Sequence, residues 1–211
     1  IVWLRLADYL AIFSVSAIFF LLFFAIIVLY SYSLTAKIER ARAKLAHERN
    51  IDALTGMLNR RALNERVTHL FEAARAKGGE VVVLFADLDG FKQVNDTHGH
   101  HVGDRVLAAV AERILESVRD FDLVARYGGD EFLLILPNLK GGALEEVSDR
   151  LRKMVAASEI LLEKSTEPMH VTVSGGATLA RLGESPEQVL ERADRLLYDS
   201  KSAGKNCITF G

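Results

Sequence analysis

The pattern of apolar and polar positions along residues 51–211 predicts strands that alternate with helices. One pair of predicted strands is separated only by a short Gly-Gly turn, whereas helices separate most of the others. We therefore expect an α/β fold, in which helices flank a mixed sheet with an antiparallel component. The predicted helices cover residues 59–77, 91–97, 102–119, 142–163 and 186–203, and the predicted strands cover residues 81–87, 122–127, 131–136, 170–178 and 206–210.

An unbroken run of uncharged residues extends from Leu10 to Leu29. As a helix, at about 1.5 Å per residue, it would span about 30 Å, which is the thickness of a bilayer core. Tyr9, Tyr30 and Tyr32 bracket the run, as aromatic residues do at membrane interfaces. A signal peptide has a shorter apolar core, and a small domain seldom buries a helix that is apolar on every face. The run therefore predicts one transmembrane helix.

Charges on either side of this run predict its orientation. Arg5 is the only basic residue before it, whereas five basic residues follow it. Because positively charged flanks stay in the cytoplasm, we expect a single-pass protein of the inner (cytoplasmic) membrane, with all residues after 30 in the cytoplasm. The single cysteine, Cys207, fits that reducing compartment, and the first residue, Ile1 rather than Met, indicates a fragment. The five basic residues are Lys37, Arg40, Arg42, Lys44 and Arg49.

Residues 33–50 are charged and helix-prone, without Gly or Pro. Apolar residues recur there at four-three-four spacing, as a short two-stranded coiled coil requires, but Glu48 occupies the next position of the seam. A solvated helical connector is the alternative interpretation. The apolar residues are Leu34, Ile38, Ala41 and Leu45, and the expected parts of the chain are 1–32 (the membrane helix, about 10–29, with its flanks), 33–50 (the linker) and 51–211 (the folded domain).

The overall charge of the chain bears on whether it binds nucleic acid. The chain has 26 Lys and Arg residues and 28 Asp and Glu residues, which gives a net charge of −2. A nucleic-acid-binding protein has a strongly basic face, so this near balance argues against nucleic acid as a partner. The candidate chemistry therefore has to come from particular residues and not from the overall charge.

The segment Arg126–Phe132 has the sequence Arg-Tyr-Gly-Gly-Asp-Glu-Phe and lies between two apolar runs. It predicts a β-hairpin, because Gly-Gly can adopt the positive φ angles of two-residue turns. The turn places Asp130 and Glu131 beside glycines, whose missing side chains would let a phosphate approach the backbone. A plain solvated turn is the alternative interpretation.

Acidic residues also follow the strand predicted over 81–87, in the sequence Asp87-Leu88-Asp89-Gly90-Phe91-Lys92. Mg²⁺ is usually held by one or two carboxylates together with phosphate oxygens of a substrate, so Asp87 could bind it jointly with an acid of the hairpin. Lys92 could then face a phosphate as a point charge. The alternative is that the acids cap the following helix, an interpretation that we favour for Asp89 and not for Asp87.

Residues 95–104 combine an amide, carboxylates and three histidines. The histidine spacing matches no usual zinc pattern, and no second cluster of ligands exists elsewhere in the sequence, so we do not expect zinc. Asn95 and Asp104 are better interpreted as a guanine site, because an amide and a carboxylate can satisfy the donors and the acceptor of that base. An alternative role for Asp104 is a favourable interaction with the dipole of the helix that it begins.

Five segments, in this order along the chain, resemble the GGDEF-domain diguanylate cyclases, and the resemblance covers residues 52–211. It implies a nucleotidyl cyclase-like fold similar to a polymerase palm, with a mixed sheet surrounded by helices. Members of that family condense two GTP molecules into cyclic di-GMP and release pyrophosphate, across a homodimer in which each domain holds one GTP. The segments are Asp52–Arg61, Asp87–Asp104, Arg126–Phe132, Val173–Ala177 and Ala193–Lys201.

The resemblance also implies a role for each matched residue. Glu131 would be the catalytic acid of the motif, assisting deprotonation of the ribose 3′-hydroxyl. The metal would be Mg²⁺, with Mn²⁺ as the alternative. Lys205 stands where the family commonly has Arg, so the charge is kept but the bidentate fork is lost. The implied metal ligands are Asp87, the Leu88 carbonyl and Asp130, the guanine contacts are Asn95 and Asp104, and the phosphate contacts are Gly90, Phe91, Lys92, Lys201 and Lys205.

Five residues separate Gly128 from the end of an Arg-x-x-Asp string, Arg119 to Asp122. That position resembles the family members that bind their own product at an inhibitory site, whereas the string alone would indicate only a weak exposed ion pair. Three alternatives to a membrane-anchored diguanylate cyclase stay open. They are a catalytically silent receptor for cyclic di-GMP, a cyclase that is inactive until an upstream sensor dimerises it, and an enzyme that makes a mixed guanine–adenine product.

Overall fold

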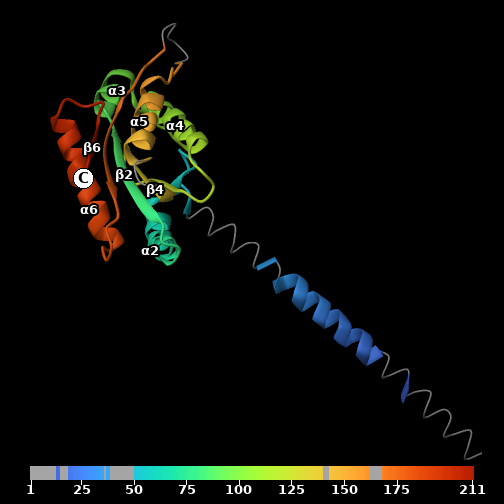
Figure 1. Cartoon of the computed structure of the whole chain (residues 1–211). Coiled ribbons are helices and arrows are strands. Elements are labelled where there is room, and N and C mark those ends of the chain that lie inside the picture. The colour runs from blue at the N-terminus through green and yellow to red at the C-terminus, as the bar shows by residue number, and fades with distance from the viewer. Residues whose placement is uncertain (1–12, 15–18, 36, 39–49, 140–142, 162–167) are drawn as a thin grey trace, which may run out of the picture. The chain divides into compact units, whose positions relative to one another are not determined.

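The computed structural model describes residues 13–14, 19–35, 37–38, 50–139, 143–161 and 168–211. The chain divides into two compact units, residues 1–47 and 48–211 (Figure 1). In the first unit the described residues are helical, and their large apolar side chains are exposed.

The structure of the first unit does not agree with the predicted transmembrane helix. In the part of it that the structure describes, no helix is both long enough and apolar enough to cross a bilayer. The predicted transmembrane helix over 10–29 and the inner-membrane location are therefore not supported, although residues 10–12 and 15–18 lie outside the described residues.

Most of the expected linker, residues 36 and 39–49, also lies outside the described residues. Leu34 and Ile38, two residues of the proposed seam, are helical and about half exposed, at 45% and 44%. The coiled coil therefore stays a prediction.

The second unit alternates strands and helices, as the hydrophobic pattern predicts. Its boundaries differ from the predicted ones mainly by a few residues at each end. The strands are β1 (Leu58–Asn59), β2 (Glu80–Leu88), β3 (Leu123–Arg126), β4 (Glu131–Leu139), β5 (Val173–Leu179) and β6 (Ile208–Phe210), and the helices are α2 (Arg60–Ala76), α3 (Phe91–His98), α4 (His100–Ser117), α5 (Ala143–Ala156) and α6 (Pro186–Ser202).

These strands form one six-stranded mixed sheet with the order β1-β3-β4-β2-β5-β6. β2 lies between β4 and β5 and is antiparallel to both. The pairs β1–β3 and β5–β6 are parallel, while β3 and β4 form an antiparallel hairpin. The expected mixed sheet flanked by helices is thus confirmed.

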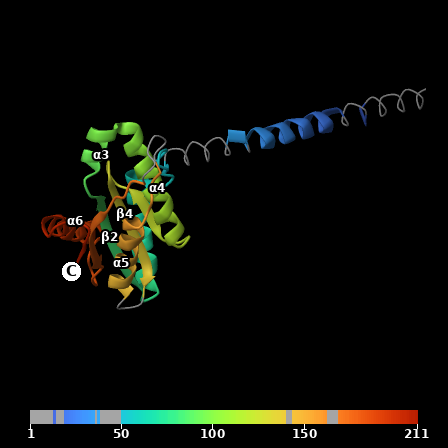
Figure 2. The same ribbon diagram turned by 90° about the horizontal axis from the view of Figure 1, so that it is seen from above.

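Helices cover both faces of the sheet, which gives two hydrophobic cores. Successive side chains of β2 point alternately into one core and into the other. Val82, Leu84 and Ala86 belong to the core that includes residues of α4 and α5. Val83 and Phe85 belong to the core that includes residues of α2 and α6. Figures 1 and 2 show α6 on one side of the sheet and α4 with α5 on the other. Asp87 is two residues after Phe85 in β2, so its side chain points to the same face of the sheet, which α6 covers.

One predicted helix is too long. The pattern predicts helix over 142–163, but α5 ends at Ala156. The hydroxyl of Ser158 donates to the Met154 carbonyl at 2.8 Å, and such local side-chain bonds compete with helix continuation. Ile160 then forms an isolated antiparallel bridge with Met169, so the backbone is extended there and no longer helical.

Candidate active site

Antiparallel pairing of β2 with β4 brings two acidic segments together at one end of the sheet. Asp87 lies directly opposite Glu131 in the strand register. The backbone N–H of Leu88 donates to the carbonyl of Asp130 at 3.2 Å. Lys201 of α6 completes the cluster, since its Nζ lies 2.8 Å from Oδ2 of Asp87. Three segments that are distant in the sequence therefore share one site.

The hairpin loop differs from the expected two-residue turn. β3 ends at Arg126 and β4 begins at Glu131, so the loop consists of residues 127–130, closed by a bond from Tyr127 N to Glu131 O at 2.8 Å. Neither Gly128 nor Gly129 has a positive φ, so the expected reason for the Gly-Gly pair is wrong. A Cβ at Gly128 would instead meet Oε2 of Glu131, so any other residue here would require the Glu131 side chain to move. The missing side chain lets the Glu131 carboxylate lie against the loop.

Asp87 is only 7% exposed. Burial raises the pKa of its carboxyl group, and the neighbouring charges of Asp130 and Glu131 raise it as well. The hydrogen bond and charge of Lys201 oppose these effects without cancelling them, so the pKa lies above its ordinary value. A further cation beside Asp87 would favour its charged form.

The donor set at this end of the sheet fits a divalent metal that is shared with a substrate. Asp87 and Asp130 offer hard carboxylate oxygens, and the backbone of Leu88 bonds to that of Asp130. Mg²⁺ is usually held by one or two carboxylates and completed by phosphate oxygens and water. Within the described ranges, no group of three or more His, Cys, Asp or Glu side chains is arranged to hold a metal alone. Substrate oxygens would therefore have to complete the coordination.

The turn after β2 leads directly into α3. Gly90 has φ 71° and caps α3 without any side-chain hydrogen bond, so neither Asp87 nor Asp89 caps this helix. The favoured interpretation of Asp89 as a helix cap is therefore wrong. The free N–H groups at the start of a helix favour anions, and the exposed Lys92 lies in the first turn of α3.

Asn95 and Asp104 lie on adjacent helices, α3 and α4. The Oδ1 of Asn95 lies against Gly103, where a Cβ would collide with it. Asp104 is the next residue and is exposed, so the amide and the carboxylate occupy the junction between the two helices. Lys205, by contrast, lies in the turn between α6 and β6, with φ 67°, and its N–H donates to the Ser200 carbonyl at 3.2 Å.

Two residues to which the sequence analysis assigned no role in the site contact the segments that build it. Asp52 binds Arg126, the last residue of β3 before the hairpin loop. Asp89 binds the backbone of Asn206, the neighbour of Lys205. No local pattern signals either contact, because each joins segments that are far apart in the chain.

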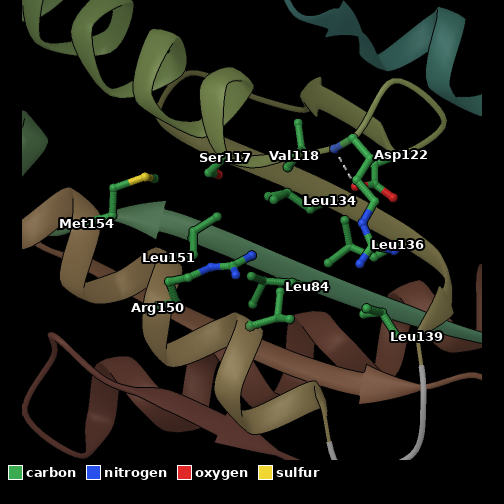
Figure 3. Close-up of a pocket in the computed structure, with 12 residues that line it drawn as sticks. Leu84, Ser117, Val118, Asp122, Leu134, Leu136, Leu139, Arg150, Leu151 and Met154 are labelled. Carbon is green, nitrogen blue, oxygen red and sulfur yellow. Dashed lines mark hydrogen bonds between the residues drawn. The ribbon is translucent and has the colours of Figure 1, made fainter.

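Arg119 and Asp122 lie at a separate pocket of about 320 Å³ (Figure 3). The carboxylate of Asp122 accepts a bond from the Arg119 backbone N–H at 2.8 Å, and burial raises its pKa. Figure 3 shows the side chain of Arg150 extending from α5 into the same pocket, whose walls are mostly apolar. No sequence pattern links Arg150 to this pocket, because it lies 28 residues beyond Asp122 and belongs to another element.

Known proteins match this chain over its second unit. The family described as "Diguanylate cyclase, GGDEF domain" matches residues 49–207. The response regulator PleD of Caulobacter vibrioides is 38% identical over 158 residues, which are 74% of this chain and 35% of PleD. The diguanylate cyclase DgcP of Pseudomonas aeruginosa is 38% identical over 155 residues, which are 74% of this chain and 23% of DgcP. The chain thus spans about a third of the length of these relatives, or less.

A solved structure is similar over more of the chain. It is the crystal structure of the coiled coil and GGDEF domain of DgcB from Caulobacter crescentus in complex with c-di-GMP. The TM-score is 0.78 and the identity 32%, and the match covers 85% of this chain and 96% of that one. On the family match, these relatives and the geometry of the β2–β4 end of the sheet, the chain belongs to the GGDEF-domain family of diguanylate cyclases.

Proposed function

We propose that this chain is a diguanylate cyclase, which condenses two molecules of GTP into cyclic di-GMP and releases two molecules of pyrophosphate. The observation that carries this proposal is the register that sets Asp87 opposite Glu131, with Asp130 and Lys201 beside them. Membership of the GGDEF family supports the reaction type. Such phosphoryl-type transfer depends mostly on positioning and on neutralisation of charge, which these residue types provide.

In the proposed reaction, the 3′-oxygen of one GTP attacks the α-phosphorus of the other. The new P–O bond forms as the bond to the pyrophosphate oxygen breaks, and Glu131 assists removal of the hydroxyl proton. Asp87, Asp130 and the Leu88 carbonyl would hold Mg²⁺, which when bound neutralises negative charge on the phosphates.

The rest of the site would bind and orient the substrate. Asn95 and Asp104, at the junction of α3 and α4, would contact guanine through its donors and acceptor. Phosphates would be held by cationic side chains and by backbone N–H groups at the start of α3. The proposed phosphate contacts are Gly90, Phe91, Lys92, Lys201 and Lys205.

Each domain would hold one GTP, so two domains have to meet face to face before either 3′-oxygen can reach the other α-phosphorus. Dimerisation is therefore part of the proposed mechanism. The segment preceding residue 51 is a candidate for arranging it, and the similar DgcB structure contains a coiled coil together with its GGDEF domain.

The pocket at Arg119 and Asp122 supports a product-binding role. A guanidinium can stack on a guanine and donate to its acceptor edge, and a carboxylate accepts from its amino groups. Arg150 adds a second cation for the phosphates of cyclic di-GMP. This pocket also supports the second candidate function, a receptor that binds cyclic di-GMP without making it.

Incubation of the chain with GTP and Mg²⁺, followed by mass spectrometry of the products, tests the proposal. We expect cyclic di-GMP and pyrophosphate, and a loss of about 100-fold or more in rate for Glu131→Gln. Cyclic di-GMP binding without turnover would favour the receptor instead. Because dimerisation is required, the assay should cover a wide range of protein concentration.

A further inference from the structure

The carboxylate of Asp89 joins three segments of the chain. Its Oδ2 accepts from the Thr172 hydroxyl at 2.7 Å, and its Oδ1 accepts from the Ser174 hydroxyl at 2.7 Å. Its Oδ2 also accepts from the backbone N–H of Asn206 at 2.9 Å. One side chain at the exit of β2 thus holds both the start of β5 and the turn that carries Lys205.

That turn has an unusual backbone. Lys205 has φ 67° and Asn206 has φ 46°, which is the left-handed region that residues other than glycine seldom adopt. Two consecutive residues in this region persist only where surrounding contacts impose them, and such positions cluster at functional sites. Asn tolerates the conformation better than Lys, so contacts at Asn206 are suited to impose it on both.

The contacts at Asn206 come from two directions. Its N–H binds Asp89, and its side-chain Oδ1 accepts from Nη1 of Arg152 at 3.0 Å. Arg152 is itself fixed, because its Nη2 binds Asp149 at 2.7 Å. The turn is therefore attached both to the end of β2 and to α5.

Asp89 precedes Gly90, where the proposed phosphate-binding turn begins. The same residue therefore places two groups of proposed phosphate contacts, the start of α3 and Lys205, in a defined relation to each other. We propose that Asp89 is a positioning residue that holds Lys205 over the phosphates of GTP. This inference rests on the proposed function, and it assigns Asp89 no contact with the substrate.

The inference predicts a selective loss, which binding measurements on Asp89→Asn can detect. The amide keeps the size of the side chain but removes its negative charge, so the Asn206 N–H then has only a neutral, weaker acceptor. In a Glu131→Gln background, where GTP is not consumed, the Kd for GTP should rise about tenfold, as expected when a hydrogen bond to a charged group becomes one to a neutral group. The Kd for GMP, which lacks the β- and γ-phosphates, should change less than about twofold.

A double-mutant cycle with Lys205→Ala separates positioning from a general structural effect. If Asp89 acts through Lys205, Asp89→Asn should weaken GTP binding little further once Lys205 is alanine. Additive losses, or an equal loss for GMP, would overturn the inference. Ser174→Ala is the matched control, because it removes a bond to Oδ1 of Asp89 and leaves the Asn206 contact in place.

A second variant acts on the same bond from its other end, in case Asp89→Asn does not fold. Asn206→Pro removes the N–H donor and excludes the positive φ, while the bonds from Thr172 and Ser174 to Asp89 can remain. This variant should also weaken the binding of GTP more than that of GMP. A ratio of the two Kd values equal to that of the parent protein would contradict the inference. Failure of the parent protein to bind either nucleotide would instead overturn the proposed function itself.

Discussion

Arg126 binds Asp52 across 74 positions of the sequence, with Nη1 at 3.2 Å from Oδ1. The same guanidinium donates to the carbonyl of Gly129 through Nε at 3.1 Å and Nη2 at 2.8 Å. Asp52 in turn accepts from the N–H and the hydroxyl of Thr55. The Arg126 side chain therefore connects the turn at 52–56 to the loop that carries Asp130.

We expect Arg126→Lys to lower both stability and turnover. Lys keeps the charge but cannot bind Asp52 and the Gly129 carbonyl at once. Both side chains are largely buried, with 19% and 23% exposure, so the loss in free energy of unfolding should be about 1–2 kcal/mol by urea denaturation. Arg61→Lys is the control, since the exposed Arg61–Glu65 pair contributes at most about 0.5 kcal/mol. Equal losses in the two variants would contradict the special role of Arg126.

Acid should weaken this connection. Burial raises the pKa of Asp52, but hydrogen bonds from Thr55 and the charge of Arg126 outweigh it, so the folded pKa lies below the ordinary value of 3.8. The stabilisation by Asp52 is then complete above the ordinary pKa and is lost as the pH falls from it through the folded pKa. Urea denaturation at a series of pH values should show a steeper acid loss in the wild type than in Asp52→Asn. Parallel curves would exclude this assignment.

The effect of Asp87 on stability should have the opposite pH dependence. Burial and the charges of Asp130 and Glu131 raise its folded pKa, so its charged form destabilises the fold as the pH rises through that pKa. In EDTA, the stability of Asp87→Asn relative to the wild type should therefore increase between about pH 3 and about pH 7. Mg²⁺ with GTP should raise the melting temperature of the wild type and not of the variant. A variant that is stabilised by Mg²⁺ and GTP as well as the wild type would rule out Asp87 as a metal ligand.

The two glycines of the hairpin loop should differ in their tolerance of a methyl group. Gly128→Ala would push the Glu131 carboxylate out of place, whereas a Cβ at Gly129 meets no atom within 4 Å. A displaced catalytic group can cost about 100-fold, so kcat should fall by about that factor in Gly128→Ala. Steady-state kinetics should show a much smaller loss in Gly129→Ala. The reverse order would mean that the position of Glu131 does not depend on Gly128.

Product inhibition can be tested at the second pocket. Arg119→Ala should raise the cyclic di-GMP concentration for half-inhibition by about tenfold or more, since a charged contact is lost. GTP turnover measured before product accumulates should be unaffected. Arg150→Ala should shift inhibition in the same direction, because its side chain enters the same pocket. Inhibition curves identical to that of the wild type would exclude this pocket as the inhibitory site.

The elements of the second unit could largely be predicted from the sequence, because hydrophobic periodicity reflects which face of each element is buried. Helix α6, predicted over 186–203, is found at Pro186–Ser202, where the Ser185 capping box marks its start. The end of α5 could not be predicted in this way, because the side chain of Ser158 and the bridge from Ile160 to Met169 decide it.

The sequence by itself determined which residues have the chemistry of the site: acids at the exit of one strand and in one hairpin, and lysines near the C-terminus. The tertiary structure alone decided how they meet, through the register of Asp87 with Glu131 and the bond from Arg126 to Asp52. It also decided that Asp89 binds Asn206, 117 residues further along the chain, instead of capping the adjacent helix. The physical reason is that periodicity and turn chemistry act over a few neighbouring residues, whereas strand register and side-chain contacts depend on the packing of the whole unit.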